Sequence, residues 1–300
     1  MRILEVGQRA SVSKVAYGRE GRQLVAAADN CFVVWSLETF KQERAVPRVA
    51  SVMSLDCLFL PGGRSFLEAN DYWKAGDELP PVSKLASNHL PQTFTLADLS
   101  GFRCFAADGK SVLRESYGIP WQSQQRLALW DFSGNCVRGF PHTGAASGRW
   151  AEFSADGLFL AKEGSSGNIT LWDAIQREPI AELKHTDRIF GLTFSPDGRR
   201  LATSAGRTVR IWSVPDGKCQ HKFRAFRASS MCRAFSPDGK MLVAGSREGR
   251  VRVWEVESGR ELGDHDWQQG DVRGVAFSPD GLTAAAACRK QAVVVWDVDF

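Results

Sequence analysis

The sequence predicts an all-β protein built from seven copies of one four-stranded antiparallel unit, and three observations lead to this prediction. The pentapeptide FSPDG occurs three times, beginning at Phe194, Phe235 and Phe277, with about forty residues between copies. Degenerate copies extend the series of aromatic anchors to positions 17, 59, 105, 153, 194, 235 and 277. A second series, of β-branched runs that end in tryptophan, follows in phase with the first. A fixed period of this length is typical of repeat architectures.

Each unit is expected to begin with a strand that ends at its aromatic anchor and enters a tight turn. In the SPDG sequence, proline presets φ at the second turn position, aspartate suits the third, and glycine accepts a positive φ. The third strand of each unit is expected to end near tryptophan, as in TVRIWS and RVRVWE, where the alternation has the period of two that is typical of strands. These tryptophans, which we expect in the core, stand at positions 35, 130, 172, 212, 254 and 296.

A short sheet of four strands with apolar residues on both faces is not stable alone, so each unit must pack between similar units. Radial repetition of the sheets satisfies this requirement. The last unit stops after its third strand, and the segment RILEV at residues 2–6 precedes the first anchor. We therefore expect this segment to supply the outer strand of the last unit and to leave no bare edge.

The anchors and the phased tryptophans resemble WD repeats, and the chain is similar to a WD-repeat β-propeller of seven blades that forms a single domain over residues 1–300. The resemblance is strong from residue 127 onward and weakest over residues 66–96. It implies a buried network of a histidine, an aspartate, a serine or threonine, and the tryptophan. Only Asp29 occupies the aspartate position; Ser166, Gly206, Glu248 and Lys290 stand there in other units, and His185, the best histidine candidate, shares its unit with Gly206. We expect this network to be largely missing.

The composition excludes some classes of protein. With 38 basic against 34 acidic residues, a coherent basic field for nucleic acid is not expected. Arginines outnumber lysines, which favours forked contacts with carboxylates but follows equally from a genome's base composition. Seven cysteines without a CxxC pair, and no run of eighteen apolar residues, predict a cytoplasmic protein with free thiols and no membrane span.

No catalytic motif or metal-ligand motif emerges from the sequence. The five histidines lack metal-ligand spacing, there is no HExxH or GxSxG, and DGKS at residues 108–111 lacks the glycine that a phosphate loop requires at position 104. We therefore expect no cofactor, no metal and no catalytic residues.

The resemblance also implies a partner-binding end of the channel, reached by the residue four before each turn aromatic and the residue before each aspartate position. Trp121, in an insertion of the third unit, and Trp267 open on the same end, either exposed for contact or partly buried under loops. The predicted partner-binding residues are Trp121, Arg149, Phe190, Met231, Arg247, Trp267, Arg273 and Arg289. Arginine beside apolar anchors is the composition of an energetic hot spot, whereas a solvated rim without a partner is the alternative.

The leading hypothesis is a monomeric, non-catalytic scaffold whose channel mouth binds an acidic or aromatic-containing segment of another protein. One alternative is a propeller enzyme with an active site in the channel. The other is a nucleic-acid-binding module that uses the arginines.

Overall fold

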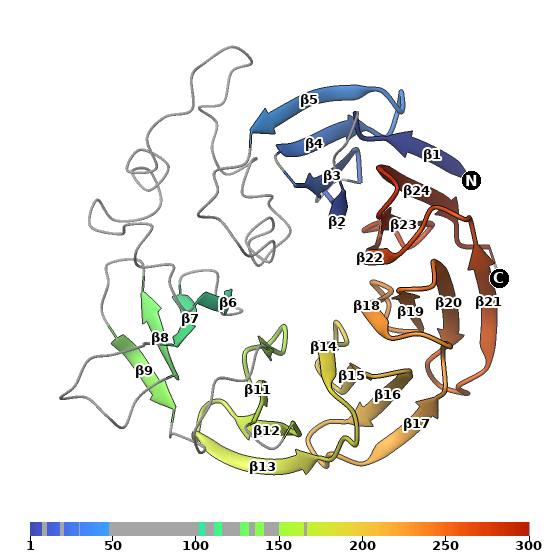
Figure 1. Cartoon of the computed structure of the whole chain (residues 1–300). Coiled ribbons are helices and arrows are strands. Elements are labelled where there is room, and N and C mark those ends of the chain that lie inside the picture. Colours follow the sequence, from blue (N-terminus) through green and yellow to red (C-terminus); the bar gives the residue numbers. More distant parts are fainter. Residues whose placement is uncertain are drawn as a thin grey trace.

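The structure is a computed structural model that describes residues 1–7, 11–18, 21–29, 31–47, 102–105, 111–115, 127–131, 136–140, 150–164 and 167–299. All regular elements of this part of the chain are strands, and they form six four-stranded antiparallel sheets. The sheets follow one another around a common centre, with the first strand of each innermost and the fourth outermost (Figure 1). The predicted all-β fold of four-stranded blades is therefore confirmed.

Each blade is one sheet of consecutive strands, apart from the last. The first holds β2 (Val12–Tyr17), β3 (Gln23–Ala28), β4 (Cys31–Ser36) and β5 (Gln42–Pro47). The third holds β6 (Phe102–Phe105), β7 (Ser111–Glu115), β8 (Leu127–Asp131) and β9 (Cys136–Phe140). The fourth holds β10 (Ala151–Phe153), β11 (Phe159–Glu163), β12 (Ile169–Asp173) and β13 (Glu178–Leu183). The fifth holds β14 (Ile189–Phe194), β15 (Arg200–Ala205), β16 (Thr208–Ser213) and β17 (Cys219–Phe223). The sixth holds β18 (Ser230–Phe235), β19 (Met241–Ser246), β20 (Arg250–Glu255) and β21 (Glu261–Asp266).

The last blade combines both ends of the chain. It holds β22 (Val272–Phe277), β23 (Thr283–Cys288) and β24 (Ala292–Asp297), and β1 (Arg2–Glu5) pairs antiparallel with β24 as its outer strand. Leu4 and Val6 are buried in the same cluster as residues of β23 and β24. The prediction for residues 2–6 is therefore confirmed as a β1–β24 clasp.

The core lies between neighbouring blades. The second strands are buried on both faces, as in β23, where four consecutive alanines and Cys288 are almost fully buried. The fourth strands are mostly exposed, as in β13. The tryptophans at positions 35, 172, 212, 254 and 296 are at most 6% exposed, which confirms them as core residues; the side chain of Trp130 lies outside the description.

The FSPDG repeat forms the same hydrogen-bonded turn in each of its three copies. In all three, the serine Oγ donates to the aspartate Oδ1 at 2.6 Å and accepts from a backbone amide five residues later at 2.9 Å. The glycines have positive φ, +69° at Gly198, +72° at Gly239 and +75° at Gly281. Each proline lies against a glycine of the next blade; a Cβ on Gly281 would lie 3.6 Å from Pro237 Cδ. The repeat is therefore the seam between blades at this end of the strands.

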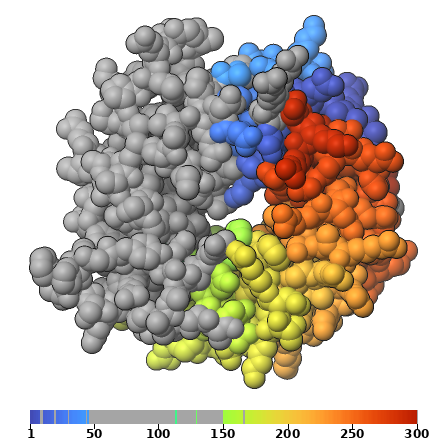
Figure 2. All heavy atoms as spheres, in the orientation of Figure 1, coloured from blue at the N-terminus to red at the C-terminus, as the bar shows by residue number. Residues whose placement is uncertain are grey.

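Two parts of the prediction lie outside the described residues. These are the second unit, anchored at Phe59 with its irregular segment 66–96, and the insertion of the third unit between β7 and β8. Figure 2 shows an opening at the centre of the described sheets, beside β2, β14, β18 and β22. Among the described residues there is no helix long and apolar enough to span a membrane.

Candidate functional site

The connections of each blade divide between two ends of the strands. Those that join the second to the third strand, and each fourth strand to the next blade, lie opposite the FSPDG turns; we call this end the mouth face and the other the turn face. Backbone hydrogen bonds join the two kinds of connection, from Gly206 N to Arg188 O (3.0 Å) and from Arg289 N to Asp271 O (2.9 Å). Since the predicted residues of the fifth to last blades stand in or beside these connections, the structure places them on one end of the molecule.

The arginines of the predicted set differ in exposure. Arg247 and Arg289 are exposed in the turns after β19 and β23, and 62% of the Arg289 side chain is accessible. Arg273, the second residue of β22, is half-buried and donates from Nη1 to Ser11 Oγ of the first blade at 3.0 Å. The Asp271 carboxylate lies between Arg273 and Arg289, at 4.0 Å and 3.8 Å respectively. Arg149 lies outside the described residues.

The predicted apolar anchors occupy equivalent places in neighbouring blades. Phe190 and Met231 are the second residues of β14 and β18, and both are half-buried. The Arg188 guanidinium lies 5.8 Å from the centre of the Phe190 ring. The inner edge of the mouth face therefore presents apolar surface beside cationic side chains.

Trp267 is half-buried and packs on the core of the last two blades. Its ring stacks on His265 with centroids 5.4 Å apart and contacts Trp296 at 4.8 Å. Only its exposed part is available for contact with a partner. Trp121 lies outside the described residues.

The aspartate position of the repeat is used in two blades. Asp29 Oδ2 accepts from Ser11 N at 2.9 Å, and Glu248 Oε1 accepts from Arg227 N at 3.1 Å. Both carboxylates thus fix the connection that enters their blade. Only Asp29 was expected to do this; the longer side chain of Glu248 reaches an equivalent amide.

In the fifth blade, part of the predicted network forms without its acid. Trp212 Nε1 donates to Thr203 Oγ1 at 2.9 Å, and the ring of His185 packs edge-on against Trp212 at 5.4 Å. Arg210 lies 3.5 Å from His185 Nδ1. Burial, reinforced by the charge of Arg210, lowers the pKa of His185 to about 4. The histidine is therefore neutral at physiological pH.

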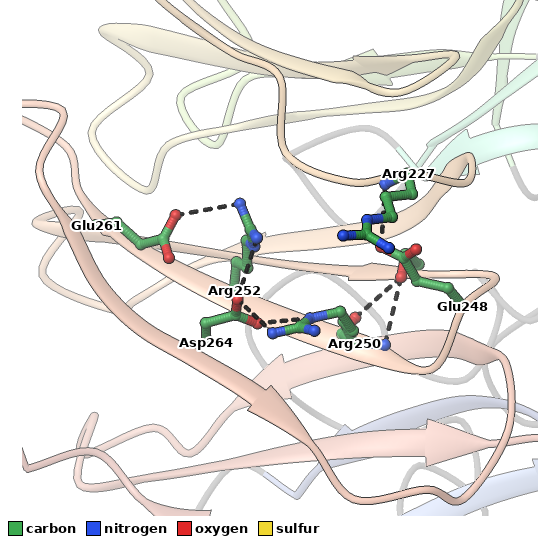
Figure 3. Close-up of polar contacts among 7 residues, drawn as sticks. Arg227, Glu248, Arg250, Arg252, Glu261 and Asp264 are labelled. Carbon is green, nitrogen blue, oxygen red and sulfur yellow. Dashed lines mark hydrogen bonds and ion pairs between the residues drawn. The ribbon is translucent and has the colours of Figure 1, made fainter.

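A charged network covers the outer part of the sixth blade, and Figure 3 shows its side chains pointing toward one another. Asp264 of β21 accepts from Arg250 Nε at 2.9 Å and pairs with Arg252 Nη2 at 3.0 Å. Arg252 also pairs with Glu261 at 3.3 Å. Partial burial would raise the pKa of Asp264, but the hydrogen bond from Arg250 and the charge of Arg252 outweigh it and lower that pKa. Both guanidinium groups thus have carboxylate partners within the blade.

Sequence reasoning missed Asp271 and this network. Asp271 belongs to a connection without a motif, and no signal in the sequence pairs it with two arginines. The alternation of RVRVWE, which puts Arg250 and Arg252 on one face of β20, could have indicated the network. Within the described residues, no group of three or more His, Cys, Asp or Glu side chains could hold a metal ion.

Comparison with known proteins identifies repeats in the carboxyl-terminal part of the chain. The sequence model of the family described as "WD domain, G-beta repeat" matches residues 177–213, 217–255 and 257–297. Among curated relatives, WD repeat and SOCS box-containing protein 1 of Xenopus tropicalis is 37% identical over 97 residues, 31% of this chain and 23% of the relative. Autophagy-related protein 18 of Schizosaccharomyces pombe is 31% identical over 124 residues, 40% of this chain and 33% of the relative. Small ribosomal subunit protein RACK1 of Caenorhabditis elegans is 28% identical over 139 residues, 42% of each protein. The chain thus spans less than half the length of each of these relatives.

Proposed function

Because this chain belongs to the WD-repeat family, we propose that it is a non-catalytic scaffold that binds a segment of another protein at the mouth face. Proteins of this family generally act as non-catalytic scaffolds that bind other proteins. The observation that carries the proposal is the gathering of Arg247, Arg273 and Arg289 on the same end of the blades as the half-buried Phe190 and Met231.

This combination favours a partner that is both acidic and apolar. Arginine and large apolar side chains are enriched among the residues that dominate binding energy at protein interfaces. The guanidinium groups suit carboxylates, and the half-buried side chains supply surface that a partner can remove from water. We therefore propose an acidic or aromatic-containing peptide segment as the partner, with the predicted residues Trp121, Arg149 and Trp267 at the margins of the same surface.

Charge reversal on the mouth face tests the proposal. The double variant Arg247→Glu/Arg273→Glu should fold, as judged by circular dichroism and melting temperature, and should lose proteins that wild type captures from a native lysate. Arg149→Glu/Arg273→Glu should have the same effect. The matched control is Arg260→Glu, which reverses an exposed arginine in the turn between β20 and β21 on the turn face. Retention of the same partners by both double variants would show that the mouth face is not the binding surface.

We also propose that the chain is a monomer formed by one domain over residues 1–300 and that it resides in a reducing compartment such as the cytoplasm. The four described cysteines are all free. Burial raises the pKa values of Cys232 and Cys288 to about 12, which keeps both as unreactive thiols. Sedimentation equilibrium and the location of a tagged chain test these two statements.

A further inference from the structure

The geometry points to one carboxylate-binding position on the mouth face, formed in the last blade by Arg273 and Arg289 around Asp271. This inference rests on the proposed function and deepens it, because it names the group of the partner that binds and the place where it binds. The occupant is a glutamate or aspartate side chain of an acidic peptide segment.

The first step of the argument is the length of the two ion pairs. Asp271 Oδ2 lies 4.0 Å from Arg273 Nη2 and 3.8 Å from Arg289 Nη1. Hydrogen bonds between nitrogen and oxygen require about 2.7–3.2 Å, so neither contact is a hydrogen bond. Asp271 therefore holds two cations near each other without using their donors. A carboxylate that approaches Arg289 can take two parallel hydrogen bonds from its guanidinium.

The second step is a comparison with the other arginine group of the described blades. Arg250 and Arg252 contact Asp264 at 2.6–3.0 Å, and Arg252 also contacts Glu261. These guanidinium groups already have carboxylate partners at hydrogen-bond distance. Around Asp271, two guanidinium groups share one carboxylate, so the group keeps an excess of positive charge. The last blade, rather than the network of the sixth, has capacity for an added anion.

The third step is the support that the surrounding loops give to this position. Lys290 donates from its backbone N to Gln269 O at 3.0 Å and from Nζ to Gln268 O at 3.1 Å, which ties the β23–β24 turn to the β21–β22 connection. Gln268 and Gln291 have φ of +56° and +63°. Non-glycine residues persist in this region only where the surrounding structure fixes them. The arginines thus extend from a backbone that is set before a ligand arrives.

The fourth step identifies the occupant as a peptide. Arg273 is the second residue of β22 and corresponds in position to Met231 of β18, the inner strand of the preceding blade. A segment whose carboxylate lies at Arg273 and Arg289 can place a neighbouring apolar side chain against Met231. A free anion would gain only the first of these contacts.

The test uses a fluorescein-labelled peptide of alternating glutamate and glycine around one central leucine, titrated by fluorescence anisotropy at two salt concentrations. Arg289→Glu and Arg273→Glu should each raise the Kd about tenfold, the change expected from losing a charged hydrogen bond. Arg289→Lys should raise it less, because lysine keeps the charge but loses the fork. The control Arg260→Glu should leave the Kd unchanged, and a peptide with lysine in place of glutamate should not bind.

Two outcomes would overturn the inference: no binding of the glutamate peptide by wild type, or equal affinities of wild type, Arg289→Glu and Arg273→Glu. Neither outcome decides the proposed function. If partners from a lysate are still lost from Arg247→Glu/Arg273→Glu, the mouth face binds them through other residues. If they are retained, the proposed function itself is wrong.

Discussion

Replacing Thr203 by valine removes the only described hydrogen-bond partner of Trp212 Nε1 and keeps the shape of the side chain. Thr203 is fully buried on β15, Trp212 is 6% exposed on β16, and their hydrogen bond is 2.9 Å long. Because the volume hardly changes, no cavity forms, and the main cost is an indole N–H that is buried without an acceptor. Such an orphaned donor costs about 1–3 kcal/mol. A loss of about 2 kcal/mol lowers the melting temperature of a domain of this size class by about 4–8 °C.

Urea denaturation followed by circular dichroism measures the free energy of unfolding for this variant. The matched control is Thr203→Ser, which loses a methyl group but keeps the hydroxyl, and it should be the more stable of the two variants. If Thr203→Val is as stable as wild type, the hydrogen bond does not hold the tryptophan. If the two variants are equally destabilised, the methyl group rather than the hydroxyl matters.

The last blade offers the same experiment in reverse. Among the described residues, no acceptor reaches the buried Nε1 of Trp296. Thr203 lies opposite Arg210, two residues before Trp212, and Ala286 lies opposite Val294, two residues before Trp296. The hydroxyl of Ala286→Ser should therefore reach the indole and raise the free energy of unfolding by about 1 kcal/mol. Serine adds one atom, so the risk of overpacking is smaller than with threonine.

Three further predictions concern other parts of the fold. Leu4→Ala should lower the free energy of unfolding by about 2–3 kcal/mol and Ile3→Ala by less than about 1 kcal/mol, because Leu4 is 5% and Ile3 44% exposed on β1; equal losses in urea denaturation would contradict the clasp. A Cβ at Gly191, where φ is +152°, would collide with the Arg233 guanidinium, so Gly191→Ala should cost about 1–2 kcal/mol in wild type and less in Arg233→Ala. A double-mutant cycle measures this difference, and additive costs would show that the two residues are independent. Burial lowers the pKa of His185 from 6.5 to about 4, so the unfolded chain binds more protons between these pH values, and the stability from neutral His185 is present above pH 6.5 and lost toward pH 4. The melting temperature of His185→Gln should therefore fall less steeply with pH over this range than that of wild type, and parallel curves would refute the assignment.

The repeat period made the fold predictable from the sequence. Each FSPDG turn and each buried tryptophan is a local requirement of one blade, so their spacing marked the strands of every described blade. The β1–β24 clasp was also predictable, since the last unit lacked a fourth strand and the segment before the first anchor had the pattern of one. The side chains that stabilise the blades were less accessible. Glu248 replaces an aspartate at the cost of one extra methylene, and only coordinates show that it still reaches a backbone amide.

The two ends of the blades differ in how far the sequence determines them. On the turn face, each proline lies against a glycine of the next blade, so the same packing recurs and the same five residues recur with it. On the mouth face the connections read HTDR, FRASS and WQQGD in successive blades, and the turns between second and third strands differ as much. No shared packing between blades imposes one sequence there, and side chains such as those of Arg247 and Arg289 extend into solvent. Positional rules of the repeat located the arginines because the blade fixes where each turn lies. They could not locate Asp271, since its pairing depends on how two unlike connections meet, and the carboxylate-binding position follows from that meeting rather than from any repeated pattern.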